Sequence, residues 1–292
     1  MKKYLLTLSI AVISLGAFAQ IKTPQPSPVS TVKQEFGLGE ISISYARPAA
    51  KGRVVFGDLV PFDKIWRTGA NASSKVTFSD DVMIEGNKLA AGEYALYTIP
   101  GKAEWTIIFH KNTKMWGLGD PGDYKEENDA LRVKVKSQAT MYSTESFTIS
   151  LSDVMPTSAN LNIEWEKTKV SVKVTTDIDA KVQASIEKTL NPKVNGNAYY
   201  SAASYYFEND KDMNKALDWV NMAIAQRADA FWMVHLKAKI LKKMNNNTAA
   251  IEAANLSKEI ANKAGNADYV ALNDKLIAEI NAPAKDTKSK KK

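Results

Sequence analysis

The sequence contains no cysteine, and this absence excludes several classes of protein. A chain without thiols forms no disulfide, has no cysteine nucleophile and cannot bind zinc or an iron–sulfur cluster through thiolates. Histidine is scarce as well, because His110 and His235 are the two histidines among 292 residues. A histidine-rich metal centre is therefore not expected, and we predict no metal site and no cofactor.

Motifs that fix a reaction are also missing. We find no Gly-x-Ser-x-Gly elbow, no phosphate-binding glycine loop and no zincin helix. The sequence therefore assigns no catalytic residue, and it leaves open whether the chain is an enzyme, although a non-enzymatic role is favoured.

A basic binding face is absent too, although the formal net charge is +7. Lys2 and Lys3 contribute two of these charges, and residues 285–292, with five lysines and one aspartate, contribute four more. The remaining body is close to neutral, whereas nucleic-acid binding requires a folded cationic surface that follows the phosphates. We therefore expect no nucleic-acid partner, and we interpret residues 283–292 as a Lys-rich disordered tail.

The first nineteen residues have the pattern of a secretory signal peptide. Two lysines precede an apolar stretch at residues 5–15, and Ala17-Phe18-Ala19 forms a small-x-small cleavage site before Gln20. The apolar stretch is too short to span a bilayer comfortably. We therefore predict an exported protein, periplasmic or secreted, without stable membrane insertion after cleavage of residues 1–19.

After a Pro-rich lead-in at residues 20–29, the hydrophobic period is two as far as residue 176. Apolar residues alternate with polar ones, which is typical of half-buried antiparallel strands. The clearest segments are 41–45, 131–135, 147–151, 161–165 and 169–175, and residues 94–99 and 105–109 are continuously apolar. Short loops at 85–88 and 100–102 indicate hairpins. We predict an antiparallel β-sandwich of eight or more short strands over residues 30–176.

From residue 177 to 282 the period is that of helices. Small residues recur 34 positions apart, at Ser204 and Ala238, at Ala216 and Ala250, and at Ala223 and Ser257. Small residues at these offsets let antiparallel helices approach closely. Residues 197–264 thus resemble two tetratricopeptide-like hairpins followed by a capping helix. The predicted fold class is α+β multidomain, a β-sandwich followed by an all-α tetratricopeptide-like domain.

One stretch departs from the strand pattern and carries a resemblance. It reads YARPAAKGR at 45–53, FGDLVP at 56–61 and IWRTGAN at 65–71, and is followed by LAAGEYALYTIPG at 89–101 and EWTIIF at 104–109. With these phrases, residues 26–174 resemble the bacterial family known as domain of unknown function 2911. The family has no assigned activity, so the resemblance implies a domain without implying a reaction.

Arginine is concentrated in the same stretch. The chain has 39 basic residues but only five arginines, three of which are Arg47, Arg53 and Arg67. The planar guanidinium suits carboxylates, phosphates or buried carbonyls, whereas lysine serves surface solubility. Trp66 and Asn71 lie beside these arginines in the sequence. Two interpretations stay open: a pocket for an anionic or sugar-like ligand, or a long loop pinned over the sheet by its arginines and by Trp66.

These residues define two hypotheses about function. In the first, the chain is a binding or scaffold module, with a ligand site at the loop edge of the sandwich and a protein partner bound by the helical repeats. The candidate ligand-binding residues are Arg47, Arg53, Trp66, Arg67, Asn71 and His110. In the alternative, a hydrolase acts on an extracellular polymer or small molecule in a pocket formed by Arg47, Arg67, Asn71 and His110. Convergence of those four side chains would favour the hydrolase.

Overall fold

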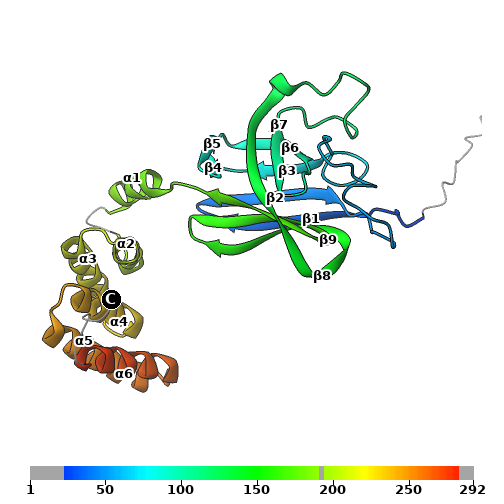
Figure 1. Ribbon diagram of the computed structural model, residues 1–292. Helices are drawn as coiled ribbons and strands as arrows, with labels where there is room; N and C mark the ends of the chain where they lie inside the picture. The colour runs from blue at the N-terminus through cyan, green and yellow to red at the C-terminus, as the bar shows by residue number, and fades with distance from the viewer. Residues whose placement is uncertain (1–22, 191–193, 283–292) are drawn as a thin grey trace, which may run out of the picture. The chain divides into compact units, whose positions relative to one another are not determined.

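A computed structural model describes residues 23–190 and 194–282, and it divides the chain into two compact units (Figure 1). The first unit ends at Ile178 and the second begins at Asp179. The predicted signal peptide and the Lys-rich tail lie outside the described residues, as do residues 20–22 of the lead-in.

The first unit, here called the β unit, is an antiparallel sheet of nine strands in the order β1-β2-β3-β6-β7-β8-β9-β4-β5. The strands are β1 (Val29–Phe36), β2 (Gly39–Ala46), β3 (Ser74–Phe78), β4 (Val82–Ile84), β5 (Asn87–Leu89), β6 (Gly92–Ile99), β7 (Glu104–His110), β8 (Asp129–Met155) and β9 (Ser158–Thr175). A short 3-10 turn, Glu126–Asn128, precedes β8.

Strand β8 is 27 residues long and turns the sheet over on itself. Its first part pairs with β7, and its second part pairs with β9 (Figure 1). The two layers thus enclose one core, to which Ile43 and Ile107 contribute from one layer and Ile163 and Val172 from the other. The predicted fold class, an antiparallel β domain followed by an α domain, is confirmed.

The prediction of separate short strands was wrong in two places. Residues 131–135 and 147–151 belong to the single strand β8, and 161–165 and 169–175 belong to β9. The register between β8 and β9 shifts between Ala139 and Thr144, where the alternation of apolar residues stops. Residues 139–144 contain no glycine or proline that would end a strand. The register shift therefore bends the chain while it stays in the sheet.

Both hairpins expected from the sequence are present. Ile84 pairs with Asn87 across the β4–β5 turn, and Glu85 and Gly86 between them have φ of 48° and 79°. Positive φ at both central residues is the backbone geometry of the tight hairpin turn that matches strand twist. The predicted loop 100–102 lies in the connection of residues 100–103 between β6 and β7, whose Ile99 and Thr106 are paired.

The second unit, here called the helical unit, contains six described helices. They are α1 (Asp179–Thr189), α2 (Gly196–Glu208), α3 (Met213–Gln226), α4 (Phe231–Lys243), α5 (Asn247–Lys263) and α6 (Ala267–Asn281). Four of them begin after a polar residue whose side chain accepts a backbone N–H of the first turn, namely Asn195, Asp212, Asn246 and Asn266. None of the described helices is long and apolar enough to cross a membrane.

Small residues lie where these helices meet. Ala216, Ala223, Ala238 and Ala250 are completely buried, as is Ser257. Ser204 is half-buried instead, and the neighbouring Ala203 takes the buried position. The series of helices is consistent with the tetratricopeptide-like interpretation of this region.

Candidate functional site

Residues 47–73 connect β2 to β3 and cross one end of the β-unit core. Ala50 N–H donates to the carbonyl oxygen of Glu145 at 2.8 Å, and Trp66 exchanges two backbone hydrogen bonds with Thr98 at 2.7 and 2.9 Å. Val55 and Val60, within the segment, are buried in the core of the β unit. These anchors hold a long connection in one conformation, as the pinned-loop interpretation expects.

Trp66 packs into an aromatic cluster at this end of the core. Its ring centroid lies 5.9 Å from that of Trp165 in a nearly parallel arrangement, and 5.1 Å from that of Phe147. Phe56 and Trp105 complete the cluster through edge contacts. The indole N–H donates to the carbonyl oxygen of Gly69 at 3.1 Å. Trp66 therefore closes the core, and its half-buried ring leaves one part accessible.

The three arginines of the segment donate hydrogen bonds to backbone carbonyls. Arg47 donates from Nε to Phe147 at 3.1 Å, and Arg53 donates from Nε and Nη2 to the carbonyl oxygens of Ala50 and Ala49 at 2.9 and 2.7 Å. Arg67 donates from Nη1 to the carbonyl oxygen of Asn71 at 2.8 Å. Each guanidinium thus stabilises the local backbone, and it retains N–H groups beyond those bonds.

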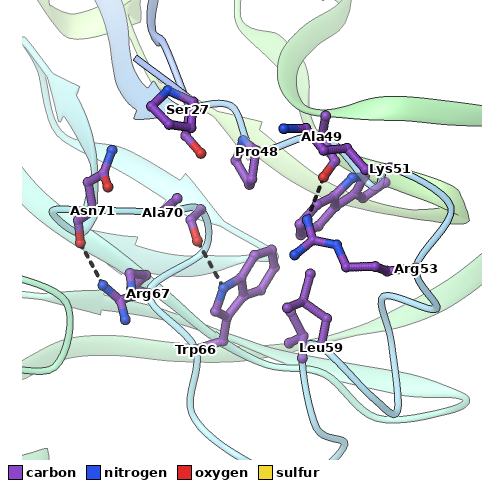
Figure 2. A pocket seen from close by; sticks show the side chains of 14 residues that line it. Ser27, Pro48, Ala49, Lys51, Arg53, Leu59, Trp66, Arg67, Ala70 and Asn71 are labelled. Carbon is purple, nitrogen blue, oxygen red and sulfur yellow. Dashed lines mark hydrogen bonds between the residues drawn. The ribbon is translucent and has the colours of Figure 1, made fainter.

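A pocket of 470 Å³ opens beside Trp66 and contains four of the six candidate residues: Arg53, Trp66, Arg67 and Asn71. In Figure 2, Trp66 lies between Arg53 on one side and the Arg67–Asn71 pair on the other. The other lining residues are mostly apolar or small: Pro26, Ser27, Pro48, Ala49, Lys51, Leu59, Val60, Gly69, Ala70 and Trp165.

Lys51 is a functional candidate that the sequence reasoning missed. It gives the pocket a third cation beside Arg53 and Arg67, and its left-handed backbone, with φ of 52°, belongs to the Lys51-Gly52 turn. The Lys-Gly pair before Arg53 was the signal available in the sequence. None of these three cations forms an ion pair with a carboxylate of the described residues.

Two carboxylates beside the segment accept backbone amides. Glu145 Oε1 accepts the N–H of Lys51 at 2.8 Å, and Glu166 Oε2 accepts the N–H of Val55 at 2.8 Å. These bonds fix the segment to β8 and β9, and neither carboxylate forms an ion pair with Lys51, Arg53 or Arg67. The described lining of the pocket thus carries three cations and contains no acid or histidine.

A strained turn holds Arg67 and Asn71 in place. Thr68 between them is completely buried and has φ of 53°, which is rare for a β-branched residue. Its hydroxyl donates to Thr98 Oγ1 at 3.1 Å, and its carbonyl accepts from Ser74 Oγ at 2.6 Å. Backbone strain of this kind is maintained by surrounding contacts and is common at binding sites.

The other two candidate residues lie outside this pocket. Arg47 also donates from Nη2 to Thr148 Oγ1 at 2.9 Å and does not line the pocket. His110 is completely buried; its Nδ1 accepts the N–H of Asn112 at 3.1 Å and its Nε2 lies 3.2 Å from the carbonyl oxygen of Lys125. The ring also stacks on Tyr124. The structure thus places His110 as an anchor of the loop after β7, and the four hydrolase residues do not converge.

A second cavity, here called the lysine groove, lies in the helical unit and has a volume of 590 Å³. Its lining is Phe207, His235, Lys239, Lys242, Lys243, Asn245, Leu272, Lys275, Leu276 and Glu279. His235 Nδ1 lies 2.8 Å from Asn273 Oδ1, and burial lowers the pKa of His235. The sequence reasoning missed this groove, because the four lysines come from two helices, α4 and α6, that are far apart in the chain.

Comparisons with known proteins identify the β unit by family alone. Neither the curated proteins nor the solved structures include a match to this chain. The family DUF2911, described as a protein of unknown function, matches residues 27–174, which cover the sheet from the residues before β1 into β9. Since this match covers half of the sequence, the chain belongs to the DUF2911 family.

Proposed function

We propose that the chain is an exported binding module whose β unit binds a small anionic group in the Trp66 pocket. One observation carries this proposal: Lys51, Arg53 and Arg67 line one cavity without an ion-pairing carboxylate among the described residues. Some cations elsewhere in the β unit do have such partners, as Arg132 has in Asp129 and Lys134 in Glu104. Cations around one cavity repel one another, so an anion bound between them stabilises the arrangement.

The walls of the pocket suggest that the anionic group is attached to a larger body. Guanidinium groups suit a carboxylate or a phosphate, because their fork of N–H donors matches two oxygens at once. Pro48, Leu59 and the accessible part of Trp66 offer apolar surface beside these donors. An acidic sugar and a glycerol phosphate both combine an anion with such a body.

Lys51 offers the cleanest test, because its side chain makes no hydrogen bond or ion pair with the described residues. We expect Lys51→Gln to retain the melting temperature and to weaken binding of glycerol 3-phosphate or glucuronate about fivefold, as measured by calorimetry. Lys88→Gln, in the β4–β5 hairpin outside the pocket, is the matched control. Equal affinities for the two variants, or no binding of either anion by the unmodified chain, would refute the proposal.

A protein partner is a second candidate role, for the helical unit, and the lysine groove favours it. Lys239 and Lys275 have no ion-pair partner among the described residues, and Phe207 and Leu272 supply apolar surface between the lysines. A groove of this composition suits a peptide that combines acidic and apolar side chains. Pull-down with an immobilised full chain and with Lys239→Glu/Lys275→Glu would test it, since charge reversal should abolish capture.

The hydrolase alternative has less support. A hydrolytic mechanism needs a general base within hydrogen-bonding reach of a water or a substrate hydroxyl. The described lining of the Trp66 pocket has no carboxylate and no histidine, and His110 is engaged in holding the loop after β7. We therefore favour binding over catalysis for this site.

A further inference from the structure

Exposed apolar side chains surround the Trp66 pocket. Val54, next to Arg53, is 61% exposed, and Leu59 on the pocket wall is 41% exposed. The exposed part of each side chain is not covered by the core of the unit. A single exposed apolar side chain is ordinary on a protein surface. The position of these side chains relative to the pocket cations therefore decides whether they indicate a binding surface.

Two more belong to the bend of β8 at the same end of the β unit. Met141 is fully exposed and Tyr142 is 63% exposed. The bend is tied to the pocket segment on both strands, because Lys51 N–H donates to Glu145 and Val55 N–H donates to Glu166, which is paired with Thr144. Figure 1 shows the bend of β8 and β9 at the same end as the long β2–β3 connection.

A further exposed aromatic residue, Trp116, lies in the loop after β7. It is 69% exposed although it stands between Met115, which is buried, and Gly117, which packs against Arg67. A Cβ at Gly117 would lie 2.8 Å from Arg67 Nη1, and the Gly117 carbonyl accepts the hydroxyl of Tyr97 at 2.8 Å. The indole is thus held outward by a well-anchored backbone.

The opposite end of the β unit provides a contrast. Leu38 and Met155, in the β1–β2 and β8–β9 turns, are 57% and 61% exposed. Both turns lie near Thr176. A Cβ at Gly37, in the first turn, would touch the Thr176 side chain, and the Thr176 N–H donates to the carbonyl oxygen of Thr157, in the second turn. Carboxylates flank these turns, namely Glu40 two residues after Leu38, Asp153 two residues before Met155 and Asp177 next to Thr176. Within the β unit, the exposed apolar side chains of the pocket end thus lie near the cations of the Trp66 pocket, whereas those of the opposite end lie near carboxylates.

We propose that the pocket end of the β unit docks on the surface of an anionic lipid bilayer. The phosphate of a lipid headgroup would occupy the Trp66 pocket, and Val54, Met141, Tyr142 and Trp116 would enter the interface around it. Cations attract an anionic lipid surface, while apolar and aromatic side chains add affinity at headgroup depth. The inference rests on the anion-binding role proposed above and names the source of the anion. Such docking is peripheral and spans no bilayer.

The experiment is co-flotation of the full chain with phosphatidylcholine vesicles that contain or lack phosphatidylglycerol. We expect binding only to the vesicles that contain phosphatidylglycerol, and about a tenfold weaker partition for Met141→Ser/Tyr142→Ser. The matched control, Leu38→Ser/Met155→Ser, should bind as the unmodified chain does. Residues 283–292 are identical in all variants, so any attraction of this Lys-rich segment is common to them.

Three results would overturn the inference: no flotation with anionic vesicles, equal loss in both double variants, or undiminished flotation of Met141→Ser/Tyr142→Ser. Calorimetry with glycerol 3-phosphate separates this failure from that of the anion pocket. If Met141→Ser/Tyr142→Ser binds the phosphate but the unmodified chain binds no vesicle, the anion site stands and a protein surface becomes the better partner. If Lys51→Gln changes neither titration nor flotation, the anion site itself is refuted.

Discussion

The Trp66 pocket and the lysine groove are both cationic and both lined by aromatic residues, but their charges are held differently. Lys51, Arg53 and Arg67 have no carboxylate partner among the described residues. In the groove, Lys242 pairs with Glu279, and Lys243 pairs with Asp210. The groove is thus partly neutralised by its own unit, whereas the pocket is not.

The difference shows how each unit stabilises a cation. The β-unit arginines donate to backbone carbonyls with part of the guanidinium and keep further donors for a ligand. In the groove, Lys239 and Lys243 lie 4.7 Å from the ring centroid of Phe207, on flexible side chains. A site built on backbone bonds is preorganised, and a site built on flexible lysines adapts to its partner.

The largest expected effect is the loss of stability caused by replacing Trp66, which lies between the pocket and the core. Trp66→Ala should lower the free energy of unfolding by about 3–5 kcal/mol, because the indole closes the core against Phe147 and Trp165. Trp116→Ala should change it by less than about 0.5 kcal/mol, because that indole is exposed. Denaturant unfolding measures both, and similar losses would mean that Trp66 is not part of the core.

A smaller loss of stability is expected from replacing the arginines, and it should differ between Arg47 and Arg67. Arg47→Ala should cost about 1–3 kcal/mol, because it leaves the carbonyl of the buried Phe147 without its donor. Arg67→Ala should cost less, since the carbonyl that it serves belongs to the exposed Asn71 and can bind water. Melting temperatures give the order, and a larger loss for Arg67 would reverse the roles assigned to them.

Acid should affect the helical unit through His235. Burial lowers the pKa of His235 below its ordinary 6.5, so the unfolded chain binds a proton at a higher pH than the folded chain does. The stability contributed by the neutral ring is therefore complete above about pH 7.5 and declines as the pH falls through 6.5. Thermal unfolding between pH 8 and pH 5 should be less pH-dependent in His235→Gln; an unchanged slope would contradict this account.

The smallest effect concerns the ion pairs of the groove. Lys242→Ala should change the free energy of unfolding by about 0–1 kcal/mol, because Lys242 and Glu279 are both substantially exposed to water and salt. Denaturant unfolding at low and high salt tests this. A loss as large as that for Arg47→Ala would show that groove and pocket are stabilised alike.

The sequence predicted the two-part architecture because its signals are local. Alternation of apolar and polar residues marks each half-buried strand, and the change to a helical period after residue 176 marks the second unit. It could not reveal that residues 131–135 and 147–151 form one bent strand, because the bend depends on pairing with two different neighbours.

The candidate site was predicted in part for the same reason. Arg53, Trp66, Arg67 and Asn71 lie in one unusual segment and line one pocket. His110 was placed among them because a histidine after an apolar strand is chemically versatile, but burial and the loop after β7 hold it elsewhere. Lys51 resembled the many other lysines apart from its place before Gly52 and Arg53, and its position in the pocket follows from the fold.

Calorimetric titration of glycerol 3-phosphate into two charge variants tests most directly whether the unpaired cations of the Trp66 pocket bind an anion. Lys51→Gln/Arg67→Gln removes two cations from the pocket, and Lys239→Gln/Lys275→Gln removes two from the lysine groove. Our account predicts that affinity falls at least about tenfold in the pocket variant and stays unchanged in the groove variant. Equal affinity in the pocket variant and the unmodified chain, or a loss confined to the groove variant, would contradict it.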